Sequence, residues 1–145
     1  MEFTLAIIKP DAVARGLTGK ILAHLEEQGF RIRGLRMLRL TEAQAREFYA
    51  VHRERPFYES LVRFMTSGPV VPVLLERENA IAKLREVIGA TDPAEAAPGT
   101  VRALYAESKE RNAIHASDAP ETARREVAFF FAAGDVLGTG EAPLG

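Results

Sequence analysis

The chain contains 145 residues, of which 47% are hydrophobic and 27% are charged. This length predicts one domain with one core, and the composition excludes a disordered or fibrous chain. The net charge of -1 argues against a dedicated nucleic-acid binder, and the absence of cysteine excludes disulfides and thiolate chemistry.

The chain begins with a predicted strand and a predicted helix. Residues 3–8 are mostly apolar and are followed by Lys-Pro-Asp at 9–11, which predicts a buried strand that runs into a turn. Thr18 is the expected cap of an amphipathic helix, and Gly29 is the expected stop of the same helix.

A second strand and two helices follow. Residues 30–40 alternate apolar residues with arginines, and the alternation slips near Gly34, which predicts a bulge in a half-exposed strand. Thr41 and Gln44 form the pattern of a capping box before an amphipathic helix. Pro56 ends this helix, and a second short helix comes after it.

A third strand and a third amphipathic segment complete the central part of the chain. Residues 70–75 predict an apolar strand, but Pro72 cannot donate a hydrogen bond, so the strand is expected to be irregular there or to lie at an edge. Residues 79–88 predict a helix that stops at Gly89.

The last part of the chain combines a long loop, a helix and a tail. Residues 90–112 contain two prolines and no clear period, and a loop of that length in an ordered domain usually has a functional use. Asp118 is the expected cap of a helix that begins at Pro120, and residues 138–145 form a glycine-rich tail. Strands separated by helices predict a two-layer α+β domain with helices on one face of a sheet. No segment has the length of a membrane-spanning helix or the pattern of a signal peptide, so we expect a cytoplasmic protein.

His115 is the strongest candidate for chemistry among the three histidines. It ends a short apolar segment just before a helix, with Ser117 beside it and Glu126 able to return toward it from the first turns of that helix. A carboxylate or hydroxyl bonded to one ring nitrogen would fix the tautomer and direct the other nitrogen outward. From the residues alone, a catalytic and a structural role of His115 both stay open, whereas His24 and His52 are expected to be ordinary helix residues.

The sequence contains no phosphate-binding loop of the Walker type and no metal-binding motif. Residues 16–21 have the wrong spacing for a Walker A loop, and neither a His-Glu-x-x-His nor an EF-hand pattern is present. Nucleotide phosphates would therefore have to be bound by separate cations. The candidates near element ends or in loops are Lys9, Arg55, Arg85, Arg102 and Arg111, although any single one of them is more often a solvated surface charge.

Six blocks of the sequence, in the right order, resemble the nucleoside diphosphate kinase family. They are found at 8–17, 49–57, 66–71, 89–93, 98–102 and 112–118. The most specific block is Asn-Ala-Ile-His-Ala-Ser-Asp at 112–118. The resemblance implies a kinase domain over residues 1–137 and a flexible tail at 138–145.

The resemblance implies a ferredoxin-like βαββαβ fold with a four-stranded antiparallel sheet. It also implies ping-pong transfer of the γ-phosphoryl group from a nucleoside triphosphate, mainly ATP, to a nucleoside diphosphate. By matching position, His115 is the nucleophile that becomes phosphohistidine. The matching nucleotide-binding positions are Lys9, Phe57, Arg85, Thr91, Arg102 and Asn112, with Tyr49, Arg55, Ser117 and Glu126 in support. Mg²⁺ is expected on the nucleotide phosphates rather than on protein side chains, and the expected assembly is a homohexamer, with a tetramer as the alternative.

Three positions depart from the family pattern, and two other functions compete with the kinase. Pro72 occupies a strand, Leu104 replaces a carboxylate in the loop, and Ala116 follows the histidine where many members have glycine. One alternative is a catalytically silent nucleotide- or nucleic-acid-binding module on the same fold, which the absence of a basic excess disfavours. The other alternative is a hydrolase with His115 as general base, for which the sequence offers no serine or cysteine nucleophile motif.

Overall fold

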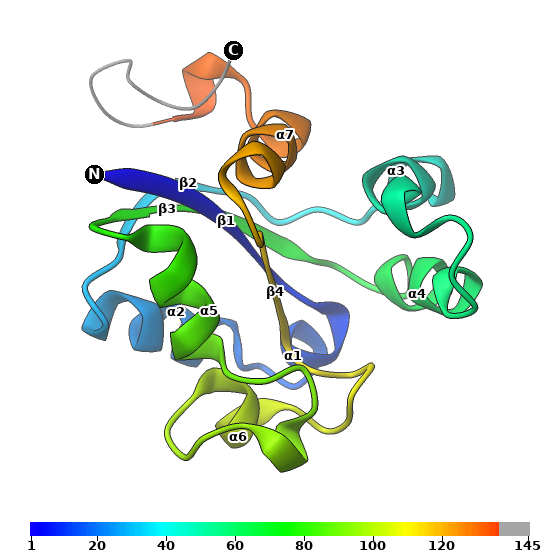
Figure 1. Cartoon of the computed structure of the whole chain (residues 1–145). Helices are drawn as coiled ribbons and strands as arrows, with labels where there is room; N and C mark the ends of the chain where they lie inside the picture. Colours follow the sequence, from blue (N-terminus) through cyan, green and yellow to red (C-terminus); the bar gives the residue numbers. More distant parts are fainter. Residues whose placement is uncertain (137–145) are drawn as a thin grey trace.

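The structure, a computed structural model, describes residues 1–136. Four strands, β1 (Glu2–Ile8), β2 (Arg31–Leu35), β3 (Val71–Arg77) and β4 (Ile114–Ala116), form one sheet in the order β2-β3-β1-β4 (Figure 1). Every pair of neighbouring strands is antiparallel. This arrangement confirms the predicted ferredoxin-like fold, while the predicted tail at 138–145 and the last residue of the predicted domain lie outside the described residues.

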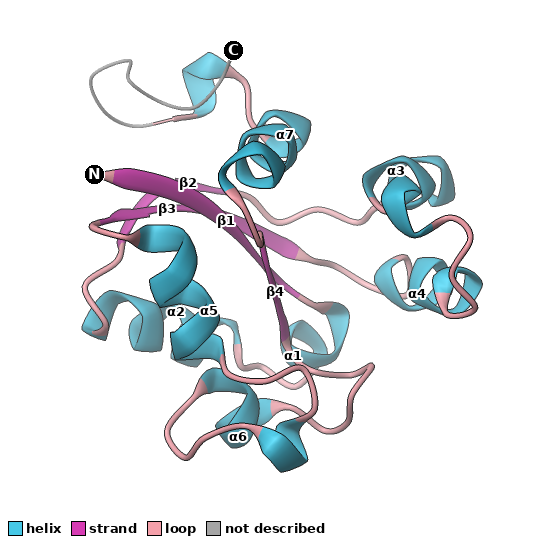
Figure 2. Cartoon of the chain, viewed as in Figure 1, coloured by secondary structure: helices cyan, strands magenta, loops and turns pink. Residues whose placement is uncertain are grey.

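Helices cover both faces of the sheet. They are α1 (Pro10–Ala14), α2 (Thr18–Glu27), α3 (Glu42–Phe48), α4 (Tyr58–Met65), α5 (Ala80–Ile88), α6 (Val101–Tyr105) and α7 (Pro120–Phe130), with short 3₁₀ helices η1 (Ala50–His52), η2 (Pro93–Glu95) and η3 (Ala133–Asp135). The helices α2 and α5 lie on one face, and α7 lies on the other with the pair α3 and α4 beside it (Figure 2). No helix among the described residues is long and apolar enough to span a membrane.

The expectation of helices on a single face is therefore wrong. Ala6 and Ile8 belong to the apolar core under α2 and α5, whereas Leu5 and Ile7 belong to a second core under α3, α4 and α7. All four side chains are fully buried. Successive side chains of a strand point to opposite faces, so the continuous apolar run at 5–8 needs cover on both sides.

The predicted helix caps are partly confirmed. Thr41 and Gln44 make the complete capping box at the start of α3, with bonds of 3.1 and 2.9 Å. Thr18 is instead the first residue inside α2, because Leu17 already has helical dihedral angles and its carbonyl accepts the first bond. Asp118 stays exposed, because Pro120 forces the preceding Ala119 into an extended conformation and makes that residue the cap of α7.

The second and third strands behave largely as predicted. The register between β2 and β3 shifts between Ile32 and Gly34, which confirms the bulge, although regular pairing of β2 stops at Leu35. Pro72 pairs in register with Ile7 on the interior strand β3. The Pro72 carbonyl accepts a hydrogen bond from the Arg36 N–H. The N–H and the carbonyl of a strand residue point to the same side, so the N–H that Pro72 lacks would face Arg36, one residue beyond the end of β2.

Two segments predicted as turn or loop contain helices. The turn after β1 is the start of α1, with Lys9 as its cap and Pro10 at its first position. The long segment from 90 to 112 contains η2 and α6, and Val101 of α6 is fully buried in the core under α5. The segment is therefore anchored within the chain by its own apolar residue.

Gly89 ends α5 in a backbone conformation that favours glycine. Gly89 has φ +88°, and a Cβ there would lie 2.5 Å from Thr100 Oγ1, whose hydroxyl is fixed by bonds to Ala97 and Ala103. We expect Gly89→Ala to lower the free energy of unfolding by about 2–4 kcal/mol, through left-handed strain together with overpacking. Gly99→Ala is the matched control, since Gly99 has φ +85° and no atom within 4 Å of the new Cβ. Gly99→Ala should lower the free energy of unfolding, measured with urea, by about 1–2 kcal/mol. Equal losses in the two variants would contradict a steric contact between residue 89 and Thr100.

Candidate active site

The side chain of His115 lies at the centre of the candidate site. Its neighbours Ile114 and Ala116 point into the core under α2 and α5, so strand alternation directs His115 toward α7 and α3. Its Nε2 lies 2.8 Å from Oε1 of Glu126 on α7, and Ser117 donates its hydroxyl hydrogen to the same oxygen at 2.8 Å. The histidine side chain is 21% exposed, so one side of the ring is open to solvent.

The charge of Glu126 determines the tautomer of His115. Burial alone would raise the pKa of the Glu126 carboxyl, but hydrogen bonds from His115 and Ser117 and the nearby Arg125 guanidinium together hold that pKa below its ordinary value. Glu126 is therefore ionised at neutral pH and can only accept hydrogen bonds. The neutral imidazole then carries its proton on Nε2, and Nδ1 keeps its lone pair.

A series of aromatic rings connects His115 to the surface. Tyr49 is buried at the end of α3, with its ring centre 6.3 Å from that of His115. The ring centre of His52 on η1 lies 6.4 Å from that of Tyr49 and 5.5 Å from that of Phe57, a residue that is 45% exposed. Burial, with Glu126 nearby, raises the pKa of Tyr49, so its hydroxyl stays neutral. The series of Tyr49, His52 and Phe57 thus ends in an exposed aromatic face.

Lys9 and Asn112 lie together at the edge of the site. Lys9 Nζ donates to Asn112 Oδ1 at 2.8 Å, and Asn112 Nδ2 donates to the Thr91 carbonyl at 3.2 Å, while the Thr91 side chain is exposed. Burial, with Arg102 nearby, lowers the pKa of Lys9 to about 8, although the charges of Asp11 and Glu110 oppose this shift. Lys9 is thus a buried ammonium whose hydrogen-bonded side-chain partner is neutral.

Arg102 provides a second buried cation. Its guanidinium donates to the carbonyls of Gly89 at 3.0 Å and Ile114 at 2.7 Å. Burial, together with the charge of Arg85, lowers the pKa of Arg102 to about 10, which leaves it charged at neutral pH. The exposed Arg85 is therefore close enough to act on Arg102, whereas Arg55 is exposed between η1 and α4 and has no described contact that ties it to this group.

The turn before β4 is strained and is held from the first helix. Ala113 has φ +74°, and Ile114 N donates to Asn112 O at 2.9 Å, which together define a tight γ-turn. A left-handed alanine costs about 1–2 kcal/mol. Asp11 Oδ2 accepts from the Ala113 N–H at 3.0 Å, and the Lys9 N–H donates to the Ala113 carbonyl at 2.9 Å. No local pattern in the sequence indicates this contact of Asp11, because Asp11 and Ala113 are 102 residues apart.

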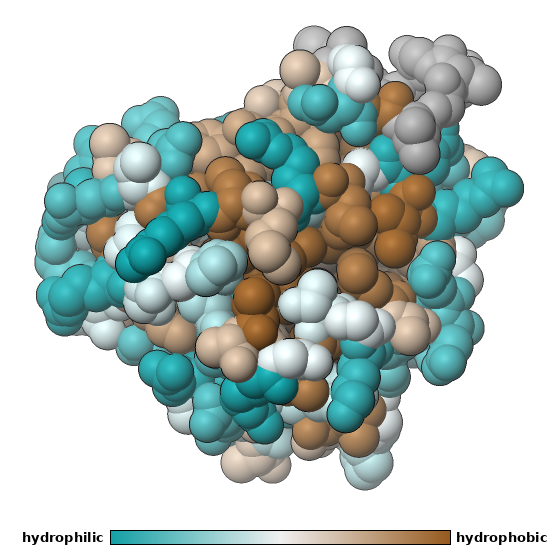
Figure 3. Space-filling model, turned by 180° about the vertical axis from the view of Figure 1, so that it is seen from behind, coloured by the Kyte–Doolittle hydropathy of each residue, from teal (hydrophilic) through white to brown (hydrophobic). Residues whose placement is uncertain are grey.

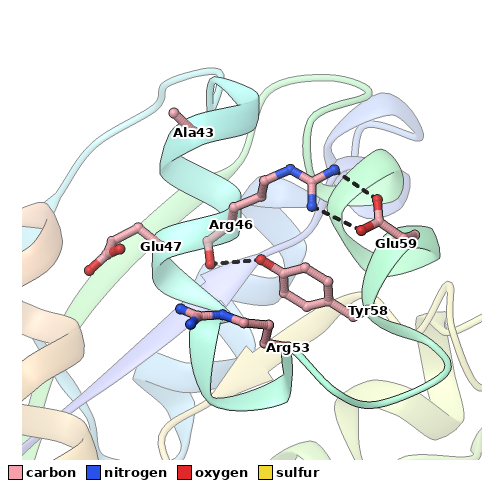
Figure 4. Close-up of a pocket in the computed structure, with 6 residues that line it drawn as sticks. All are labelled: Ala43, Arg46, Glu47, Arg53, Tyr58 and Glu59. Carbon is pink, nitrogen blue, oxygen red and sulfur yellow. Dashed lines mark hydrogen bonds and ion pairs between the residues drawn. The ribbon is translucent and has the colours of Figure 1, made fainter.

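A separate pocket of about 370 Å³ lies on the outer side of α3 and α4 (Figure 4). Arg46 crosses between the two helices to bond Glu59 at 2.9 and 2.7 Å, and the Tyr58 hydroxyl donates to the Arg46 carbonyl at 3.0 Å. None of the sequence-predicted site residues lines this pocket. Its residues hold the two helices together, and the candidate chemistry lies elsewhere.

The arrangement combines an oriented imidazole with nearby cations and an exposed aromatic face. No group of three or more His, Asp or Glu side chains able to hold a metal is found within residues 1–136. Buried ammonium and guanidinium groups suit an anionic ligand, and the neutral imidazole suits attack on an electrophile such as phosphorus. The site therefore has the components for phosphoryl transfer.

Known proteins show the same chain organisation. The sequence model of the nucleoside diphosphate kinase family matches residues 2–136. A nucleoside diphosphate kinase of Nitratiruptor sp. is 56% identical over 94% of this chain and its own full length, and one of Dinoroseobacter shibae is 59% identical over 95% of this chain and 99% of its own. The structure of the Aquifex aeolicus nucleoside diphosphate kinase is similar with a TM-score of 0.92, at 51% identity over 94% of this chain and 99% of that chain. That of the Halobacterium salinarum enzyme, in complex with CDP, gives a TM-score of 0.91 at 40% identity, over 95% of this chain and 92% of that chain.

The buried ammonium of Lys9 should titrate near neutral pH. With a pKa of about 8, Lys9 loses its proton as pH rises through that value in the ligand-free protein. The titration can be followed by ¹³C NMR of the lysine side chains, with Lys9→Met assigning the signal. Added pyrophosphate should move the transition to higher pH, because an anion stabilises the charged form. A Lys9 signal that stays unchanged until about pH 10, the range of a free lysine, would contradict this environment.

Proposed function

The chain belongs to the nucleoside diphosphate kinase family, which transfers the γ-phosphoryl group of a nucleoside triphosphate to a nucleoside diphosphate, and we propose that in this protein the group passes through His115. The observation that carries the proposal is the 2.8 Å bond between His115 Nε2 and the buried Glu126 carboxylate. This bond keeps the proton on Nε2 and leaves the Nδ1 lone pair for attack.

The reaction then proceeds in two half-reactions. Nδ1 of His115 attacks the γ-phosphorus of the triphosphate, the N–P bond forms, and the bridging P–O bond breaks as the first diphosphate leaves. The terminal oxygen of a second diphosphate then attacks the phosphorus of the phosphohistidine, a new P–O bond forms, the N–P bond breaks, and the imidazole leaves in its neutral form. The Glu126 carboxylate stabilises the positive charge that develops on the ring in each half-reaction, and Ser117 holds the carboxylate in place.

Cations from three segments of the chain bind the phosphates in this mechanism. Lys9, Arg85 and Arg102 neutralise the charge on the transferring group, and Asn112 and Thr91 contribute polar contacts, with Tyr49 and Arg55 in support. Catalysis of phosphoryl transfer depends mainly on such positioning and electrostatic stabilisation. The metal is expected to enter with the substrate, since the nucleotide phosphates carry Mg²⁺ and no group of three or more His, Asp or Glu side chains able to hold a metal is found in the described part of the chain, residues 1–136.

Phe57 is the proposed platform for the nucleotide base. Its exposed ring offers a stacking face, and stacking contributes about 1–3 kcal/mol per base whatever the base is. The expected specificity is therefore broad. We propose ATP as the main donor and the cytoplasm as the location, where the reaction would maintain the pools of nucleoside and deoxynucleoside triphosphates.

The proposal predicts a covalent intermediate on one residue. ATP alone should add one phosphoryl group to the protein, the adduct should be lost in acid, and GDP should remove it as GTP forms. Intact mass spectrometry measures each step. His115→Ala should abolish the mass shift, because the nucleophile is gone, whereas His24→Ala on α2 should leave it unchanged. A fully phosphorylated His115→Ala protein would disprove the assignment, and a protein that binds nucleotide without being phosphorylated would be the silent binding module.

We also propose that the chain assembles as a homohexamer, with a tetramer as the alternative. β2 is an edge of the sheet, and the exposed side chains of Leu35 and Met37 lie at and just beyond its end. Seen from behind, hydrophobic residues gather near the centre of the molecular face (Figure 3). Leu104 on α6 is 53% exposed and offers a second apolar contact. An unpaired edge with exposed apolar residues supports pairing between copies.

The assembly can be tested by light scattering at micromolar concentration. The wild-type protein should have six times the 15.9 kDa mass of the chain. Met37→Lys should weaken the contact at the β2 edge, and Pro93→Ser should weaken the contact made by the segment that holds η2. Arg63→Lys, a conservative change on α4, serves as the control. A stable wild-type monomer would exclude both the hexamer and the tetramer.

A further inference from the structure

A buried carboxylate with no assigned role lies next to the candidate site. The side chain of Asp11 is 2% exposed. Its Oδ2 accepts one hydrogen bond, from the Ala113 N–H, and its Oδ1 has no partner within the described residues. An ionised carboxylate that is buried with so few hydrogen bonds is a poor source of stability, because its desolvation is only partly compensated.

Asp11 binds the backbone at Ala113, the residue between Asn112 and the start of β4. Ala113 follows Asn112, and His115 comes two residues later. The backbone of Ala113 is bonded on both sides, to the Asp11 carboxylate through its N–H and to the Lys9 amide through its carbonyl. Since Lys9 Nζ also bonds Asn112, the beginning of α1 and the beginning of β4 form one connected unit.

The strain at this turn shows why a strong acceptor is needed. With φ +74°, Ala113 has a conformation that alanine rarely adopts, and relaxation would rotate the peptide planes on either side. Rotation on one side moves Asn112 away from Lys9, and rotation on the other side moves the start of β4. A charged acceptor binds an N–H more strongly than a neutral one, so Asp11 opposes this relaxation.

We propose that Asp11 is a positioning residue of this enzyme: its carboxylate holds the strained turn at Ala113 and thereby sets the positions of His115, Asn112 and Lys9 relative to one another. The inference rests on the proposed role of His115, and it assigns to Asp11 no contact with the nucleotide. A displacement of about 1 Å in an active site can cost a hundredfold in rate, which is the scale expected for loss of this bond.

The test measures the single-turnover rate of phosphohistidine formation from ATP, together with kcat and KM. Asp11→Ala should lower the rate about a hundredfold, mainly through kcat. Asp11→Asn keeps an oxygen for the Ala113 N–H and should stay within about tenfold of wild type. Asp135→Ala is the matched control, because Asp135 also accepts a backbone N–H, from Ala132 at 2.9 Å, but lies in η3.

A second substitution separates positioning from general stabilisation. Glycine adopts a positive φ without steric cost, so Ala113→Gly removes the strain that Asp11 opposes. The double variant Asp11→Ala with Ala113→Gly should recover at least tenfold of the lost rate. If Asp11→Ala alone does not fold, the double variant should fold, as followed by thermal unfolding, and should react within tenfold of wild type.

The pH profile gives an independent readout. The charged groups acting on Lys9 are Arg102, Asp11 and Glu110, and Asp11 is one of the two that favour the ammonium form. In Asp11→Asn this support is lost, so the alkaline limb of kcat/KM should move to lower pH. A change of stability alone would not move it.

The failures are distinguishable. If wild-type protein is not phosphorylated by ATP, the proposed function fails. If wild type is phosphorylated but a folded Asp11→Ala protein reacts within threefold of it, the positioning role is wrong. The same holds if Ala113→Gly gives no recovery in the double variant, or if the alkaline limb of Asp11→Asn stays in place.

Discussion

The pairing of β1 with β4 joins two parts of the site that lie far apart in the chain. Lys9 at the end of β1 and Asn112 before β4 are 103 residues apart, yet their side chains are bonded at 2.8 Å. Only three residues of β4 pair with β1, and His115 is the middle one, opposite Ile7. Hydrogen bonds hold this short segment at both ends. Lys9, Asp11 and Arg102 bind the backbone at its beginning, and the Ser117 N–H donates to Leu5 at its end, so together they restrict the position of the His115 backbone.

The two buried cations of the site are partnered differently from the exposed Arg46. Lys9 and Arg102 are buried and bond an amide oxygen and backbone carbonyls, whereas the exposed Arg46 bonds two carboxylates, Glu42 and Glu59. A hydrogen-bonded carboxylate at Lys9 or Arg102 would stabilise the cation but would compete with a phosphate for it. The lowered pKa values of Lys9 and Arg102 reflect the desolvation of two charged groups that have no carboxylate as a hydrogen-bond partner within the described residues. A bound polyanion would offset this desolvation.

Local signals in the sequence predicted local structure well. The capping box of Thr41 and Gln44 and the stop at Gly89 each depend on neighbouring residues, and both are present in the structure. Asp118 was expected to cap α7, but Pro120 fixed the cap one residue later through its effect on the preceding backbone. The cover on both faces of the sheet was missed, although the apolar run at 5–8 indicates it, because consecutive apolar residues in a strand place their side chains on both faces.

The site was predictable to different degrees for physical reasons. Glu126 lies on the helix that follows His115, so spacing alone could suggest their bond. Lys9 and Arg102 were candidate cations from their place near element ends, but their grouping with His115 came from the family resemblance, because nothing in the local sequence shows which distant segments meet. Asp11 and His52 acquired partners only through the tertiary structure: Asp11 at the Ala113 turn, and His52 between the rings of Tyr49 and Phe57.

The ring series from Tyr49 to Phe57 ends in an exposed aromatic residue and lies beside His115, the proposed nucleophile. In the proposed mechanism the donor and the acceptor therefore occupy the same place in turn. A diphosphate that arrives before the histidine has been phosphorylated fills that place without being able to react. Such dead-end complexes delay the next donor, so the steady-state rate should pass through a maximum as the diphosphate concentration rises at a fixed concentration of triphosphate.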